Sequence, residues 1–232
     1  MPSEINLLTA VEGRLATYSM LSRLFRAEMD EASLKSMMKM RCPINTGNSD
    51  VDRGYRLFHK YLSKVWERTL EDLACDYVNT FIGANTTGYS AAYPNESVHT
   101  SEERMLMQDA RDEICAVYRT AGLKSSESWQ MGEDHIAVEL EYMQIETART
   151  IECLKNDDIN AASVSLLRQY HFLTNHLENW VPFLVKDMLK FAQTDFYRAL
   201  AYLTQGFIQV DKDFLENILS EELEAERAMH AS

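Results

Sequence analysis

Glycine and proline are scarce in this chain, and this shortage limits the possible folds more than any other sequence feature. Eight glycines and four prolines occur in 232 residues, whereas an all-β protein of this size needs many more turn residues. Apolar residues instead recur at steps of three and four, which is the spacing of one helix face. In the first segment they are Leu8, Val11, Leu15, Tyr18, Leu21 and Phe25. The sequence therefore predicts an all-α fold of about nine to eleven helices, with no strand.

A polar segment near the middle of the chain separates two helical regions. Residues 123–132 read LKSSESWQMG, and Gly122 before them is a natural helix terminator. We expect a single compact domain with two halves, residues 1–122 and 134–232, joined by a hinge linker at residues 123–133.

Helical periodicity stops between residues 83 and 98, which predicts a long loop. Loops of this length inside a helical domain are usually functional or disordered. The aromatic residues Tyr89 and Tyr93 favour an ordered loop. A new helix is expected from about Ser101, where a capping context precedes another apolar stripe.

The second half of the sequence predicts several further helices. One is expected over about residues 159–179, and Pro182 is well placed in the first turn of the next. The last two are expected at residues 195–207 and from 211 to about 229. Residues 211–232 form an acidic tail with seven acids and two bases, which is typical of a solvated helix face.

The net charge of −13 argues against several classes of partner. Nucleic-acid binding needs clustered lysine and arginine, and the same acidity disfavours an anionic membrane surface. No segment approaches the roughly 20 apolar residues that span a bilayer, and neither a signal peptide nor a twin-arginine pair is visible. The cysteines lack CxxC spacing, which favours reduced thiols packed as small hydrophobic groups in a cytoplasmic protein. They are Cys42, Cys75, Cys115 and Cys153.

Motifs that indicate catalysis are weak, so we predict neither an enzyme nor a bound cofactor. Residues 83–90 approach a phosphate-binding loop but have tyrosine in place of the required lysine. One E-x-x-H motif occurs, at residues 96–99, whereas a di-iron bundle needs two. His135 and Glu139 are spaced to share a metal on one helix face. The alternative is therefore a helical metalloprotein that uses Glu96, His99, His135 and Glu139.

Residues 132–135 (GEDH) place three polar residues directly before an apolar stripe. Asp134 suits a helix N-cap, because its carboxylate accepts hydrogen bonds from the first turn. A helix N-terminus disfavours a charged imidazole, so we expect His135 to be neutral and available for hydrogen bonding. The twelve methionines fit either a flexible core or an adaptable groove for apolar peptides.

Five ordered sequence blocks between residues 77 and 200 resemble the TorD/DmsD family of redox-enzyme maturation chaperones. The clearest block is Asp134-His135-Ile136 with Glu139 to Met143, which resembles the family signature D-H-I-x-x-E-L-x-[FY]-M. The other blocks are Tyr77 to Gly83, Pro94 to Thr100, Phe172 to Trp180, and Phe196-Tyr197. The chain departs from the family pattern at Met131-Gly132, where the family usually has E-P, and at Asn95 and His99, which replace tyrosines.

The resemblance implies a cytoplasmic, all-helical chaperone. It would bind the twin-arginine leader and the apo form of a molybdopterin oxidoreductase catalytic subunit, assist cofactor insertion and delay export. The family also implies a monomer, or a homodimer that exchanges halves across the linker. Guanine nucleotide binding, discussed for the family, has no independent support in these residues.

A twin-arginine leader combines two guanidinium groups with an apolar stretch, so its recognition needs carboxylates and a groove. The candidates for the arginine contacts are Asp134, Glu133 and Glu96. The candidates for the groove are Tyr77, Phe81 and Tyr93. His135 and Ser97 would orient the loops, and Glu139 is the remaining residue predicted for the peptide-binding site. A third hypothesis, an adaptor for an ordinary protein helix, predicts indifference to arginine-to-lysine changes in the partner.

Overall fold

The computed structural model describes residues 4–83, 90–126 and 128–224. Within these ranges the chain forms ten α-helices and two short π-helical segments, which confirms the expected all-α fold. The elements before the linker are α1 (Glu4–Arg26), α2 (Glu31–Met38), α3 (Ser49–Leu62), α4 (Thr69–Tyr77), η1 (Val78–Ile82), α5 (Glu96–Thr100) and α6 (Asp109–Thr120). The elements after it are α7 (Ile136–Lys155), α8 (Ile159–Phe172), η2 (Leu173–Leu177), α9 (Glu178–Phe191) and α10 (Asp195–Ile218).

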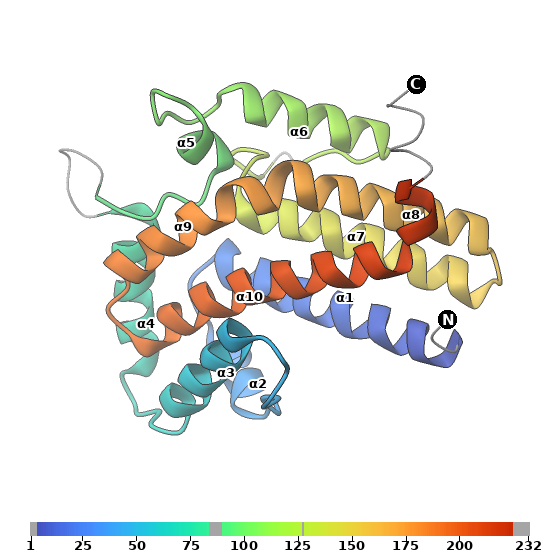
Figure 1. The fold of residues 1–232 in the computed structure, drawn as a ribbon. Coiled ribbons are helices and arrows are strands. Elements are labelled where there is room, and N and C mark those ends of the chain that lie inside the picture. The colour runs from blue at the N-terminus through green and yellow to red at the C-terminus, as the bar shows by residue number, and fades with distance from the viewer. Residues whose placement is uncertain (1–3, 84–89, 127, 225–232) are drawn as a thin grey trace.

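Helix α10 crosses the middle of the molecule, with α9 along one side and α3 on the other (Figure 1). Helices α1 and α7 pair along their lengths, and α8 packs against α7. Both main pairings, α1 with α7 and α3 with α10, join an element before the linker to one after it. The two sequence halves therefore share one core.

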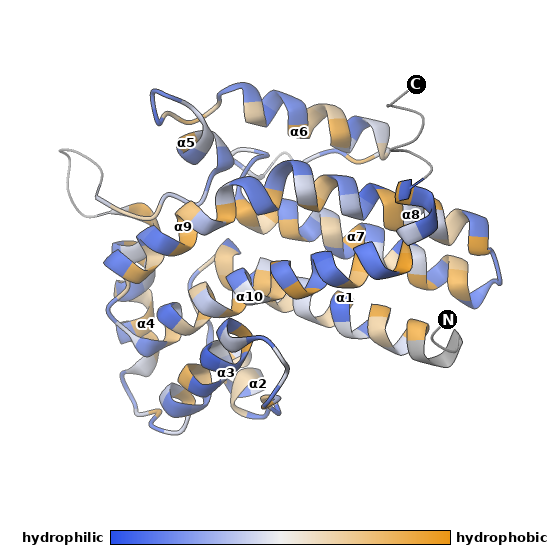
Figure 2. Cartoon of the chain, viewed as in Figure 1, coloured by the Kyte–Doolittle hydropathy of each residue, from blue (hydrophilic) through white to orange (hydrophobic). Residues whose placement is uncertain are grey.

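The helices are striped, with apolar and polar residues on different faces (Figure 2). The apolar stripes meet in a core whose largest fully buried side chains include Trp180, Tyr18, Tyr197, Phe25 and Phe58. Such stripes are typical of helices that bury one face against their neighbours. In the described part of the chain, no helix combines the length and the apolar character needed to cross a bilayer.

Helices α3 and α10 approach closely because a glycine lies on each at the crossing. A Cβ atom on Gly54 would lie 2.9 Å from the Leu203 Cβ, and one on Gly206 would lie 2.6 Å from the Val51 nitrogen. Both distances are too short for a real side chain, so this packing requires glycine at both positions.

A buried ion pair joins α1 to α10. Asp211 accepts hydrogen bonds from the Arg14 guanidinium, including one from Nη2 at 2.9 Å, and a further one from the Tyr18 hydroxyl. Asp211 is 1% exposed and Arg14 is 6% exposed. The expectation that the acidic tail is a solvated face is therefore wrong at its first residue, because Asp211 has a cationic partner 197 positions earlier.

The helix expected from Ser101 begins eight residues later, at Asp109. The loop that was expected up to residue 98 ends earlier, because the short helix α5 begins at Glu96. Residues 101–108 then form a turn-rich connection to α6. Arg104 and Met107 in this connection have φ angles of 52° and 61°, which a continuous α-helix excludes. The Ser97 hydroxyl accepts a hydrogen bond from the Gln108 backbone at 3.2 Å and so ties the connection to α5.

Two expected helix breaks in the second half are absent. Residues 159–191 form one continuous helical path of α8, η2 and α9, in which Pro182 lies inside α9. Helix α10 likewise continues from Asp195 to Ile218, where two helices were expected. No glycine or proline separates Phe207 from Asp211, and burial of α10 against its neighbours keeps it continuous.

The four cysteines are free thiols, as expected for reduced residues. Their packing differs from the prediction, because Cys75 is exposed and the other three are only partly buried.

Candidate functional site

Two of the family-like blocks meet in space at the start of α7. The backbone around Asn95 pairs in antiparallel fashion with the backbone around His135. The Glu96 N–H donates to the Asp134 carbonyl at 2.9 Å, and the Ile136 N–H donates to the Pro94 carbonyl at 2.8 Å. We name this pairing of residues 94–97 with residues 131–136 the junction.

Asp134 lies at the centre of the junction and is 1% exposed. One carboxylate oxygen accepts from the Ser97 backbone N–H at 3.0 Å, and the other accepts from the Asn95 amide at 3.2 Å. Asp134 thus caps α5 from a distance and does not cap α7, contrary to the prediction. Gly132 has a φ of +89°, and a Cβ there would lie 2.7 Å from the Asp134 carboxylate, which explains the glycine at this departure from the family pattern.

His135 is the N-cap residue of α7, the place expected for Asp134. Its Nδ1 accepts a hydrogen bond from the Ala137 backbone N–H at 3.1 Å. Burial, together with the charge of Arg26, lowers the pKa of His135 to about 3, so the ring is neutral near pH 7 as expected. The Trp129 ring contacts the imidazole with a T-shaped geometry, at 5.1 Å between centroids.

Glu139 is fully buried one turn into α7. One of its oxygens accepts from the Trp180 indole at 3.0 Å, and the other has no hydrogen-bond partner among the described residues. Burial and the nearby charge of Glu96 raise the pKa of Glu139 well above its usual value, which favours the protonated acid. Glu96 is itself buried and accepts from His176 Nδ1 at 3.1 Å.

The residues of the metalloprotein alternative do not form a ligand set. His99 donates through Nε2 to the Tyr93 carbonyl at 2.8 Å, and its ring stacks on Trp180. His135 uses Nδ1 for its cap, and Glu139 bonds to an indole. Across residues 4–83, 90–126 and 128–224, no three or more histidine, cysteine or acidic side chains are placed to hold a common metal ion.

Two residues expected to line a groove belong to the core. Tyr77 and Phe81 pack on each other with ring centroids 5.1 Å apart, and the Tyr77 hydroxyl donates to the Phe25 carbonyl at 3.0 Å. Tyr93 is only partly buried, and its hydroxyl lies 3.3 Å from the Ser90 hydroxyl. Tyr89 lies outside the described residues.

Glu133 keeps part of its surface beside the junction. Its side chain is 22% exposed and forms an ion pair with Arg111 of α6, with 2.6 Å between Nε and Oε2. Met131, two residues earlier, is 50% exposed. The Glu133 carboxylate and the Met131 side chain are therefore both accessible directly before the buried Asp134.

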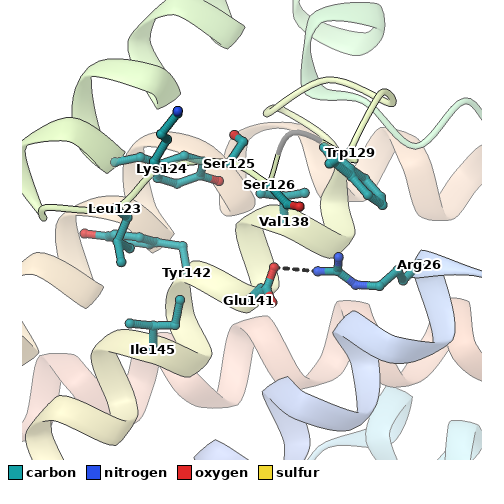
Figure 3. Close-up of a pocket in the computed structure, with 11 residues that line it drawn as sticks. Arg26, Leu123, Lys124, Ser125, Ser126, Trp129, Val138, Glu141, Tyr142 and Ile145 are labelled. Carbon is teal, nitrogen blue, oxygen red and sulfur yellow. Dashed lines mark hydrogen bonds and ion pairs between the residues drawn. The ribbon is translucent and has the colours of Figure 1, made fainter.

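A cavity of about 250 Å³ lies beside the linker, between α6, α7 and the end of α1 (Figure 3). Its walls include Trp129 from the linker and Glu141 and Tyr142 from α7, and Arg26 reaches in from α1. Sequence reasoning did not select these residues for the site. The lone tryptophan in a polar linker was the available signal, but nothing in the sequence places Arg26 next to Glu141.

Sequence comparisons identify the family. The model of the nitrate reductase delta subunit family matches residues 47–186, more than half of the chain. A chaperone protein TorD from Vibrio cholerae is 23% identical over 227 residues, which cover 95% of this chain and 99% of that protein. A chaperone protein TorD from a Shewanella species is 28% identical over 219 residues, covering 89% and 95%. The chain therefore belongs to the nitrate reductase delta subunit family, which comprises TorD-type maturation chaperones rather than enzymes.

Proposed function

We propose that this maturation chaperone binds the twin-arginine leader and the apo form of a molybdopterin oxidoreductase catalytic subunit in the cytoplasm. It holds the subunit until the cofactor is inserted and thereby delays export. The names of the TorD relatives and the five family-like sequence blocks support this assignment.

One observation carries the proposal: the buried signature residues hold an accessible linker that bears both kinds of group a leader requires. Asp134 and His135 are each 1% exposed, whereas Met131 before them is half exposed. Trp129 and Glu133 are partly exposed in the same segment. Carboxylates bind guanidinium groups, and an accessible apolar surface accepts the hydrophobic part of a leader.

Burial changes the roles expected from the sequence. Asp134, His135 and Ser97 position the linker through the junction, and the direct contacts come from the accessible residues. Glu96 and Glu139 support α5 and α7 from inside the fold. Glu133 is proposed to contact a leader arginine, because part of its side chain reaches the surface beside its ion pair with Arg111.

The charge of the chain supports the same partner. A net charge of −13 attracts a basic leader over a distance and increases the rate of encounter. Salt weakens this long-range attraction, because the Debye length is about 8 Å at physiological ionic strength.

The test is isothermal titration of the full chain with a synthetic twin-arginine leader from an oxidoreductase encoded beside its gene. We expect binding that weakens about tenfold when both arginines become lysine, because lysine cannot form the bidentate contact. Binding should also weaken as salt increases. Equal binding of the arginine and lysine peptides would favour the adaptor, and no binding to either the leader or the full apo-subunit would refute the proposal.

A further inference from the structure

Arg26, the last residue of α1, occupies a site with the chemistry of an arginine receptor (Figure 3). Its guanidinium forms an ion pair with Glu141 of α7. Its Cζ atom also lies 5.0 Å from the centroid of the Trp129 ring. A carboxylate beside an aromatic face is a favourable environment for guanidinium, because the planar group pairs with one and stacks on the other.

The aromatic face of this site is held in place by the junction. The Trp129 indole N–H donates to the Gly132 carbonyl at 2.7 Å, and the ring contacts His135. The position of the Trp129 ring therefore does not depend on Arg26 alone, because both contacts come from the linker and the start of α7. The site would keep its shape if another guanidinium took the place of Arg26.

Four apolar side chains line the space beside the ion pair, namely Leu123, Val138, Tyr142 and Ile145. The polar residues Lys124, Ser125 and Ser126 complete this part of the lining. The cavity volume of about 250 Å³ is just below the range of about 300–1,000 Å³ typical of small-molecule sites, so it suits one or two apolar side chains. An arginine followed by apolar residues matches this combination of carboxylate, ring and cavity.

The contact made by Arg26 is exchangeable. Its side chain is 36% exposed and that of Glu141 is 45% exposed, so water screens the pair. The chain leaves the helical conformation directly after Arg26, so the side chain can move without disrupting a helix interior. By contrast, the Arg14–Asp211 pair is buried and is part of the core.

We propose that a guanidinium of the leader displaces Arg26 from Glu141 and Trp129, while neighbouring apolar side chains of the leader enter the cavity. This inference rests on the proposed function and assigns its arginine contact. Glu141 and Trp129 are the receptor, and Arg26 is an internal competitor that reduces the affinity for the leader.

The decisive variant is Arg26→Gln, measured by leader titration. Removal of the competitor should tighten binding about two- to fivefold, the fold-change that corresponds to a partly exposed ion pair. Arg23→Gln is the matched control, because it removes the same charge from the same helix. Arg23 pairs with Asp30 at the surface and does not line the cavity.

A second pair of variants tests the receptor. Glu141→Gln should weaken leader binding about fivefold, whereas Glu152→Gln, an exposed acid on the same helix, should change it little. In the Glu141→Gln background, Arg26→Gln should no longer tighten binding, because the two residues act on one contact. Circular dichroism checks that each variant is folded.

The outcomes separate this inference from the proposed function. If the wild type binds the leader but Arg26→Gln gains no more than Arg23→Gln, the inference is wrong and the proposed function stands. This comparison does not require Glu141→Gln to fold. If the wild type binds no leader, both are wrong.

Discussion

The Ser97 backbone N–H donates a hydrogen bond to the Asp134 carboxylate at 3.0 Å, so a residue 37 positions later in the chain caps helix α5. The second carboxylate oxygen accepts from the Asn95 amide. Both groups are buried, so one acidic side chain reinforces the backbone hydrogen bonds that join the two blocks of the junction. This relationship makes Asp134 a structural link between the chain segments that flank α6.

Asp134→Ala should lower the free energy of unfolding by about 3 kcal/mol, because it removes the acceptor of the buried Ser97 N–H and one of the two acceptors of the Asn95 amide. Urea denaturation of the full chain measures this change. Asp112→Asn is the control, because the side chain of Asp112 is 84% exposed. A loss below about 0.5 kcal/mol for Asp134→Ala would show that the junction does not depend on this carboxylate.

Asp211→Ala should destabilise the chain by about 3–5 kcal/mol, because it leaves the Arg14 guanidinium charged and buried without its partner. Chemical denaturation is again the measurement, and Asp213→Ala, exposed two residues later, is the control. The double variant Arg14→Met with Asp211→Leu should recover most of the loss, because it removes both charges. Equal stability of the two single aspartate variants would contradict the proposed link between α1 and α10.

The sequence predicted the helices well where the apolar stripe was long, as in α1 and α7. It placed boundaries poorly where tertiary contacts decide them. Pro182 suggested a helix start, but it lies inside α9, which follows directly on the π-helical segment η2. The signature singled out Asp134 and His135, but residue identity alone does not reveal that both side chains are buried. The contact of Arg26 with Glu141 spans 115 positions, which local periodicity does not detect.

Gly54→Ala should destabilise the chain by about 1–3 kcal/mol, because the new methyl group would lie 2.9 Å from the Leu203 side chain at the α3–α10 crossing. Gly13→Ala in α1 provides the contrast, since no atom lies within 4 Å of the added carbon. That change should stabilise by about 0.5–1 kcal/mol, because alanine favours the helix interior. Thermal and urea unfolding of both variants test whether the two changes in stability have opposite signs. Destabilisation of similar size in both variants would refute the close crossing of α3 and α10.

His135 and Glu139 should make opposite contributions to the pH dependence of stability. The pKa of His135 is about 3 in the fold and 6.5 ordinarily, chiefly because of burial. Between these values the unfolded chain binds a proton that the native chain does not, so the free energy of unfolding increases with pH. The pKa of Glu139 is raised above 4.5 by burial and by Glu96. Above pH 4.5 the native chain keeps a proton that the unfolded chain loses, so this contribution decreases with pH.

The two contributions therefore oppose each other between pH 4.5 and 6.5, each with a slope of up to about 1.4 kcal/mol per pH unit. Glu139→Gln should remove the Glu139 contribution, so that only the His135 contribution remains. Stability should then rise more steeply with pH in this window. His135→Asn, which retains a cap acceptor, should make it rise less or fall. Urea denaturation at intervals from pH 4 to 8 measures both slopes against the wild type. Parallel curves for all three proteins would mean that neither group changes its protonation on folding.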